Sequence, residues 1–343
     1  MATRREFLLG SLGALAGVTG PPGLPAGRRQ EGTAYLFDPL YLRHDTGAGH
    51  PERPSRLLAV EQRLRGEAWF DTLHPLSPRE ADIDAIALVH DPRYVELVRR
   101  EVEGGLRQLS TGDTAISEES YAVALGMVGG VLEAVDAVML GRSRNAFCAV
   151  RPPGHHATGV RGMGFCLFNG VAVAARYAQQ VHGVERVLIA DWDVHHGNGT
   201  QDIFYTDGSV FFMSTHQYPF YPGTGPRGET GEGAGAGLTM NRPFPAGAGD
   251  DEVIGAFTED LLPAARAFRP DLVLVSAGFD SRIGDLLGGF RVTDDGFRTL
   301  TQVMLEIAEV AAGGRLVSVL EGGYTLAGLA SAAHAHVEEL VHA

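Results

Sequence analysis

The sequence predicts an α/β fold built on a mostly parallel sheet, and three observations carry that prediction. Short apolar runs typical of buried strands recur along the chain. Stretches with apolar residues at helical spacing lie between them, and strands that alternate with helices form parallel sheets covered on both faces. From Thr33 onward no long linker, repeat or charge block interrupts this alternation, so we expect one domain over residues 33–343.

The predicted strands are five short apolar runs, each flanked by polar or glycine residues. They are NAFCAV (145–150), RVLIAD (186–191), SVFFMS (209–214), DLVLVSAG (271–278) and RLVSVLEGG (315–323). The predicted helices have apolar residues on one side of a 3.6-residue repeat. They cover residues 55–65, 92–103, 119–140, 168–181, 250–268 and 297–312.

The first 30 residues differ from the rest of the chain. A twin arginine, Arg4 and Arg5, precedes an apolar stretch that ends near Val18 and is too short to span a bilayer as a stable helix. This pattern resembles a bacterial twin-arginine export signal, so we expect residues 1–30 to be that signal and a flexible segment. The mature protein would then be periplasmic or extracellular, without a stable membrane span. The alternative is a cytoplasmic protein with a disordered tail.

Composition excludes several classes of protein. The formal net charge is −14, and all 28 basic residues are arginines, so nucleic-acid binding is disfavoured. The acidic balance mildly favours a cationic substrate, although solubility alone is the simpler explanation. The two cysteines, Cys148 and Cys166, form no C-x-x-C pair, which argues against a disulfide framework and against a cysteine-based zinc site. Nothing in the sequence predicts the oligomeric state.

The stretch DWDVHHGNGT (191–200) places charge directly after a buried strand. In an extended chain Asp191, Asp193 and His195 share one face. The strand is apolar as far as Ala190, so these side chains lie beyond its carboxyl end, where open α/β sheets place their sites.

Three further strands deliver reactive groups past the same end. His155 and His156 follow residues 145–150, Asp280 follows 271–278, and Tyr324 follows 315–323. A single aspartate after a strand is more often a helix cap or an ion-pair partner than a ligand. Four strand ends that carry such groups are hard to explain by packing, because buried charges are costly unless they are paired or bind metal.

Asp193, His195 and Asp280 have the chemistry of a metal site. Zinc accepts carboxylate and imidazole ligands, and three protein ligands with one open position are typical of a catalytic zinc. The ligand types alone leave manganese or iron open.

The neighbouring groups fit hydrolysis of an amide. In a tight turn His155 and His156 can reach one cavity, where one accepts a proton from an activated water and the other donates to the leaving amine. Asp191 and Asn198 are the local candidates to fix the histidine tautomers. The Tyr324 phenol can donate to the oxyanion of a tetrahedral intermediate, although an aromatic plug in a glycine turn is the simpler alternative.

These motifs together resemble the zinc-dependent histone deacetylase superfamily, which includes acetylpolyamine amidohydrolases, and the class II branch in particular. The resemblance rests on HPERPSRL (50–57), RPPGHHA (151–157), GFCLFNG (164–170), DWDVHHGNGT (191–200), STHQYPFYPGTG (214–225), GFDSRIGD (278–285) and EGGY (321–324). It implies an arginase/deacetylase-like fold with about eight strands and one zinc on Asp193, His195 and Asp280. It also implies that Asp191 bonds His155, that Asn198 contacts His156, and that Tyr324 polarises the acetyl carbonyl.

The resemblance further implies substrate and ion contacts. The residues that it assigns to the substrate channel are Phe165, Tyr221, Gly164, Leu287 at the gate and the rim acid Asp113. A potassium ion is implied near Asp191, Asp193 and His195, with Ser214 close by. Residues of the HPERP region, Arg56 among them, are expected either to line an inner cavity for acetate or to form structural ion pairs.

The implied function is zinc-dependent deacetylation of N-acetylated amines, either acetyl-lysine side chains or small acetylated amines. The first alternative is an acetylpolyamine amidohydrolase. Polyamine-selective relatives often carry a glutamate where Leu287 stands, and a leucine disfavours that alternative. A second alternative, from another class, is a module that binds acyl-lysine and turns it over poorly. The presence of Tyr324 argues against such a module.

Overall fold

The computed structural model describes residues 32–343, which are organised around one eight-stranded sheet in the order β2-β1-β3-β8-β7-β4-β5-β6. Every neighbouring pair of strands is parallel, so the predicted α/β fold is confirmed. The predicted export signal lies outside the described residues. The strands are β1 (Thr33–Leu36), β2 (His74–Leu76), β3 (Asn145–Cys148), β4 (Val187–Asp191), β5 (Val210–Gln217), β6 (Thr239–Phe244), β7 (Leu272–Ala277) and β8 (Leu316–Leu320).

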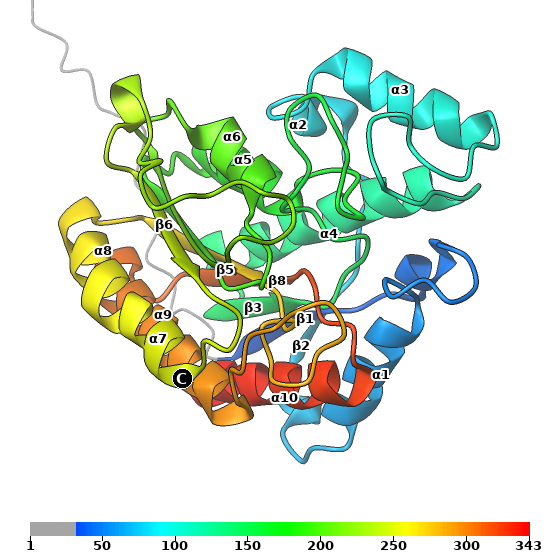
Figure 1. The fold of residues 1–343 in the computed structure, drawn as a ribbon. Helices are drawn as coiled ribbons and strands as arrows, with labels where there is room; N and C mark the ends of the chain where they lie inside the picture. The colour runs from blue at the N-terminus through cyan, green and yellow to red at the C-terminus, as the bar shows by residue number, and fades with distance from the viewer. Residues whose placement is uncertain (1–31) are drawn as a thin grey trace, which may run out of the picture.

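Helices cover both faces of the sheet (Figure 1). On one face lie α2 (Ile83–Ile86), α3 (Pro92–Glu103), α4 (Ser120–Met139), α5 (Gly170–His182) and α6 (Asn198–Phe204). On the other lie α1 (Ser55–Arg65), α7 (Asp250–Gly255), α8 (Leu262–Phe268), α9 (Asp294–Ala312) and α10 (Leu326–His342). Because both faces are covered, the central strands are buried along their whole length, and this is why they read as continuous apolar runs.

The sequence missed the weaker elements. Strand β2 has three residues, and β6 contains Asn241, Arg242 and a proline, so neither gives an apolar run. Helix α10 is rich in alanine, which weakens its hydrophobic periodicity. The expected continuous helix over 250–268 is interrupted by a π-helical turn, Ala256–Leu261, just before Pro263, which has no N–H to donate to the helix ladder.

Helix α4 is long and apolar enough to cross a membrane by length and composition alone. However, 83% of that window is buried inside the fold, as expected of a core helix packed against β3 and β1. Its apolar character is therefore accounted for by the core.

The strand order brings the predicted site together. Strands β3, β8, β7 and β4 are consecutive neighbours in the middle of the sheet, although they come from residues 145 to 320 of the chain. Parallel strands end at one edge, so the segments that follow these four strands converge there.

Candidate active site

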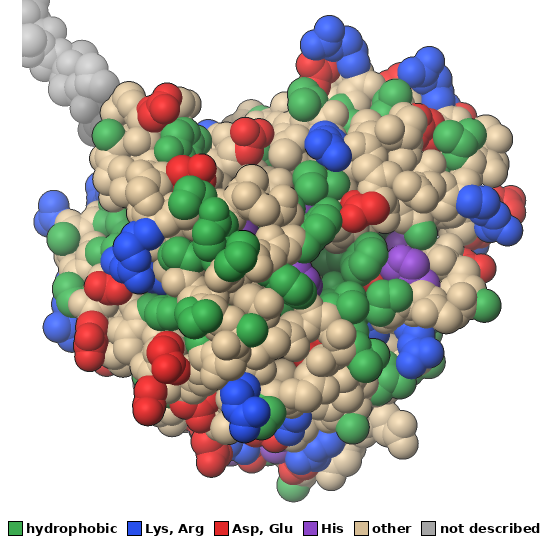
Figure 2. Space-filling view, in the orientation of Figure 1, with side chains coloured by type: hydrophobic (Ala, Val, Ile, Leu, Met, Phe, Trp, Pro, Cys, Tyr) green, Lys and Arg blue, Asp and Glu red, His purple; other side chains and the backbone are tan. Residues whose placement is uncertain are grey.

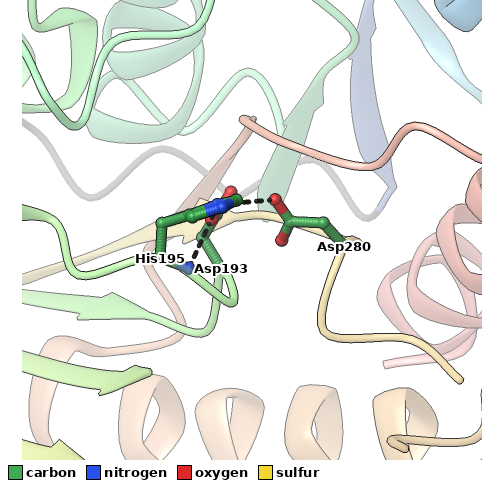
Figure 3. Close-up of side chains that lie close together, drawn as sticks. All are labelled: Asp193, His195 and Asp280. Atoms are coloured by element: carbon green, nitrogen blue, oxygen red, sulfur yellow. Dashed lines mark hydrogen bonds and ion pairs between the residues drawn. The ribbon is translucent and has the colours of Figure 1, made fainter. Parts of the chain in front are cut away.

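Three side chains that the sequence predicted as metal ligands meet at this edge. Asp193 and His195 follow β4, and Asp280 follows the adjacent strand β7. Their ligand atoms all lie within 4.8 Å of one another, and all three residues are buried. Figure 3 shows the three side chains pointing toward one another, and His195 Nδ1 lies 3.1 Å from Asp193 Oδ1 and 3.2 Å from Asp280 Oδ2.

Backbone groups fix both carboxylates. Gly322 N donates to Asp193 Oδ2 at 2.9 Å, and Val194 N donates to Asp280 Oδ1 at 2.8 Å. Glycine is required at Gly322, because a Cβ there would lie 2.1 Å from Asp280 Oδ2. The same holds at Gly278, where a Cβ would lie 2.1 Å from Asp193 Oδ2. The backbone at these two glycines therefore packs directly against the two carboxylates, and a side chain at either position would occupy the space that the carboxylates need.

The charges of this cluster fit a cation. Burial and the neighbouring charge of Asp193 raise the pKa of Asp280 to about 7. Although burial opposes a charged imidazole, the two carboxylates raise the pKa of His195 to about 10. Burial opposes the charged form of Asp193, but the charges of His155 and His195 outweigh it and lower its pKa. The Asp280 carboxyl and the His195 ring therefore hold protons near neutral pH, and a metal cation would displace those protons. The donor set and the cradle fit a zinc ion, which takes oxygen and nitrogen ligands of this kind.

The paired histidines lie beside the cluster. The rings of His155 and His156 are 4.0 Å apart, and that of His156 is 5.9 Å from the ring of His195. His155 Nδ1 lies 2.9 Å from Asp191 Oδ2, and His156 Nδ1 lies 2.7 Å from Asn198 Oδ1. The two contacts expected from the sequence are therefore present, and each leaves Nε2 of its histidine as the atom available for proton transfer.

The two histidines differ in charge preference. Burial disfavours the charged form of His155, but the Asp193 and Asp191 carboxylates outweigh it and raise its pKa. Burial, followed by the charges of His155 and His195, lowers the pKa of His156 well below its ordinary value. Groups whose environments push their pKa values apart are the usual arrangement for acid–base chemistry.

Tyr324 follows the glycine turn after β8. Burial raises the pKa of its phenol, which therefore stays protonated and able to donate a hydrogen bond. The Arg56 guanidinium lies over the ring, 4.9 Å from its centroid, and the Phe165 ring approaches it edge-on at 6.0 Å. The turn itself is held from two sides: Arg56 Nε donates to Gly323 O at 2.6 Å, and Asp285 Oδ2 accepts from Tyr324 N at 2.7 Å.

A pocket of about 500 Å³ opens over these groups. Its wall includes His156, His195 and Tyr324, together with all five residues expected at the substrate channel: Phe165, Tyr221, Gly164, Leu287 and Asp113. Figure 2 shows hydrophobic side chains gathered around a hollow in the middle of this face. The expected rim acid is tied into the wall, since Asp113 Oδ1 accepts from Gly164 N at 2.6 Å and from the Tyr221 hydroxyl at 3.2 Å.

The pocket also contains residues that the sequence reasoning missed, chiefly Phe220, Gln217 and Leu286. The Phe220 ring stacks on His195 at 5.4 Å, almost parallel to it. Gln217 ends β5, which continues three residues beyond the predicted strand, and its Oε1 accepts from Gly289 N at 2.8 Å. The motif STHQYPFYPGTG contains Phe220 and Gln217, but it gives no indication of which way this loop turns.

A buried ion-pair network packs against the segment that carries Tyr324. Arg151 donates to both Glu52 oxygens at 2.6 Å, Arg56 donates to Glu52 at 3.2 Å, and all three side chains are fully buried. Of the two expectations for the HPERP region, structural ion pairing is therefore the one that these contacts support. A second buried acid, Glu321, accepts from Gly154 N and His155 N and so holds the segment that carries the histidine pair.

Two of the residues named for a potassium ion lie on neighbouring strands, and the other two, Asp193 and His195, follow the end of β4. Asp191 of β4 is in register with Ser214 of β5, and Asp191 Oδ1 accepts from Asp193 N at 3.1 Å. Ser214 Oγ lies 3.0 Å from His216 Nδ1. These contacts bring the named residues together without testing the identity of an ion, so potassium stays a prediction.

Comparison with known proteins places the chain among deacetylases. A model of the histone deacetylase domain matches residues 50–340. A "Probable deacetylase" from Archaeoglobus fulgidus is 39% identical and aligns with 86% of this chain and 82% of its own length. The "Polyamine deacetylase HDAC10" of Homo sapiens is 43% identical over 84% of this chain, which spans only 44% of that protein. The crystal structure of the HDA15 HD domain superposes with a TM-score of 0.86 and 39% identity, covering 91% of this chain and 90% of that one.

Proposed function

This chain belongs to the histone deacetylase family and is a hydrolase of amide C–N bonds, and we propose that it removes acetyl groups from N-acetylated primary amines with the help of one zinc ion. The observation that carries the proposal is the convergence of Asp193, His195 and Asp280 at a pocket that also contains His156 and Tyr324. The substrate class is an acetylated amine whose chain is narrow enough to enter between Phe165 and Tyr221, such as an acetyl-lysine side chain.

The residues of this chain divide the chemistry between them. Asp193, His195 and Asp280 would hold the zinc, which supplies Lewis-acid activation of the acetyl carbonyl and of the attacking water. His156, neutral because of its lowered pKa, takes a proton from that water as the oxygen attacks the carbonyl carbon. The Tyr324 phenol donates a hydrogen bond to the carbonyl oxygen as it gains negative charge.

The second half of the reaction breaks the C–N bond. The proton taken from the water passes from the histidine pair to the amine nitrogen as that bond breaks, so the amine leaves neutral and acetic acid remains, which then releases its proton to solvent as acetate. Asp191 and Asn198 keep Nδ1 of each ring engaged, so that only Nε2 exchanges protons with the substrate. His155, with its raised pKa, supplies positive charge next to His156.

The proposal is tested with purified protein, zinc and a fluorogenic acetyl-lysine amide. Wild type should hydrolyse the amide, and Tyr324→Phe should lower kcat by about 10²–10³, the usual effect of removing one donor to an oxyanion. Tyr324→Phe should retain its zinc, which elemental analysis measures. Wild-type activity that survives Asp193→Ala would refute the mechanism.

Acetylpolyamines are the second candidate substrates, because relatives from Homo sapiens and Mus musculus are named polyamine deacetylases. The composition of the pocket favours acetyl-lysine over them. Leu287 stands at the gate, and among residues 32–343 the one carboxylate that lines the pocket, Asp113, already accepts two hydrogen bonds. Comparing kcat/KM for an acetyl-lysine peptide, acetylputrescine and acetylspermidine on one preparation decides between the two. Binding of acetyl-lysine without turnover would instead support the acyl-lysine-binding module.

We further propose that the enzyme is exported through the twin-arginine route, on the evidence of Arg4, Arg5 and the apolar stretch after them. An exported deacetylase would meet small acetylated amines or peptides rather than histones. Replacing both arginines by lysine should abolish export in a fractionation assay.

A further inference from the structure

The carboxylate of Asp285 joins two segments of the pocket wall that are far apart in the chain. Its Oδ2 accepts hydrogen bonds from Tyr324 N at 2.7 Å and from Thr325 N at 2.9 Å. Its Oδ1 accepts from Leu287 N at 3.0 Å. One side chain therefore fixes the backbone of two residues that line the pocket, the gate residue Leu287 and Tyr324.

The turn that carries Tyr324 needs such a brace. Gly322 and Gly323 precede the tyrosine, and Gly323 has φ of +119°, a conformation open to glycine and strained for other residues. Glycines restrict the backbone little, so the position of the phenol depends on external contacts. Arg56 holds the carbonyl of Gly323 on one side, and Asp285 holds the N–H groups that follow.

The geometry is also that of an anion at a helix start. Helix α10 begins at Leu326, so the N–H groups of Tyr324 and Thr325 lie immediately before its first turn. N–H groups at a helix start lack partners within the helix, and a carboxylate there is favoured by hydrogen bonding and by the helix dipole. Asp285 thus holds the backbone of Tyr324 in place at the point where the chain enters helix α10.

We propose that Asp285 is a positioning residue for the Tyr324 phenol. The inference rests on the proposed function, in which that phenol meets the oxygen of the acyl group. Because Asp285 also accepts from Leu287 N, the backbone of the gate residue and the backbone of Tyr324 are fixed relative to each other by this one carboxylate.

A purely structural role makes a different prediction, and Asp250 provides the matched control. Asp250 is partly buried, as Asp285 is, and its carboxylate accepts from Thr293 N at 2.8 Å and from the Thr293 hydroxyl at 2.6 Å at the start of α9. It braces a helix start without touching a residue of the pocket wall. Loss of stability alone should therefore be similar for Asp285→Ala and Asp250→Ala.

The test is a double-mutant cycle with Tyr324→Phe, using the zinc-loaded protein and the acetyl-lysine amide. Asp285→Ala should lower kcat by about 10- to 100-fold, the cost of misplacing a catalytic group, with a smaller change in KM. In the Tyr324→Phe background the same change should cost almost nothing, because there is no hydroxyl left to position. Asp250→Ala should leave kcat unchanged. A kcat of Asp285→Ala equal to that of wild type, or an equal loss in both backgrounds, overturns the proposal.

Hydrogen exchange provides a readout that does not depend on activity. The amides of Tyr324 and Thr325 should exchange faster in Asp285→Ala than in wild type or Asp250→Ala, because their acceptor is gone. Unchanged exchange overturns the positioning role even if the wild type proves inactive, an outcome that by itself would count against the proposed function. If Asp285→Ala does not fold, Asp285→Asn is the second variant, since it keeps one acceptor oxygen and should give a smaller effect in the same direction.

Discussion

Replacing Glu52 by glutamine should destabilise the protein by about 3 kcal/mol, because the change leaves two buried arginines without their counter-charge. Arg151 donates a hydrogen bond of 2.6 Å to each Glu52 oxygen, and Arg56 donates to the same carboxylate at 3.2 Å. All three side chains are fully buried. Glutamine keeps the shape and one acceptor oxygen, so the change tests charge rather than packing.

The pKa of Glu52 and the typical cost of breaking a buried ion pair give about the same loss of stability for Glu52→Gln. Although burial raises the pKa of Glu52, Arg151 and then Arg56 outweigh it and lower that pKa from 4.5 to about 2. Since each pKa unit corresponds to about 1.4 kcal/mol, the ionised carboxylate stabilises the fold by about 3 kcal/mol. Breaking a buried ion pair by removing one partner typically costs about 3–5 kcal/mol.

The assay is urea unfolding at neutral pH, read as the free energy of unfolding. Glu103→Gln is the control, because Glu103 pairs with Arg99 on an exposed helix surface and should contribute no more than about 0.5 kcal/mol. The folded pKa of Glu52 lies below the unfolded one, so the difference between wild type and Glu52→Gln is complete above pH 4.5 and shrinks as the pH falls toward 2. A loss smaller than that of Glu103→Gln would refute the reasoning.

Three further predictions concern the metal, acid stability and selectivity. Asp280→Asn should lose both zinc and activity, and full zinc content in elemental analysis would count against its role as a ligand. Burial lowers the pKa of His90 to about 4 and that of His336 to about 3. Each neutral histidine therefore makes its full contribution to stability above pH 6.5 and loses about 2 kcal/mol of it by pH 5, because the unfolded state then binds a proton that the folded state does not. The free energy of unfolding in urea should be smaller at pH 5 than at pH 7. Its dependence on pH should be weaker in His336→Gln. Leu287→Glu should raise kcat/KM for acetylspermidine relative to an acetyl-lysine peptide, and an unchanged ratio would argue against Leu287 as the gate.

The middle of the fold could be predicted from the sequence because buried parallel strands leave an unmistakable pattern. Strands β3, β4, β7 and β8 are short apolar runs, and their reactive residues come directly after them. Once the strands are assigned, the rule that parallel strands end at one edge brings Asp193 and Asp280 together. Their direct contact also needs β4 and β7 to be neighbours, and that strand order comes from the structure, because the alternation of strands and helices does not determine it.

The rest of the site depends on the paths of loops, which local sequence does not determine. Phe220 and Gln217 reach the pocket because of how the segment after β5 turns, and Asp285 reaches Tyr324 across 39 positions of the chain. The edge strands were missed for another reason: β2 is three residues long and β6 is only partly buried, so neither needs an apolar run.

The position of β8 has a consequence for how the enzyme comes into being. It is the last strand to be synthesised, yet it lies between β3 and β7 in the centre of the sheet. A nascent chain that has emerged only as far as residue 315 lacks the strand that joins β3 to β7. The segment after β3, which carries the histidine pair, and the segments after β7 and β4, which carry the expected metal ligands, are then not held together by the sheet. Premature termination anywhere before that strand should therefore yield inert protein rather than a weakened enzyme.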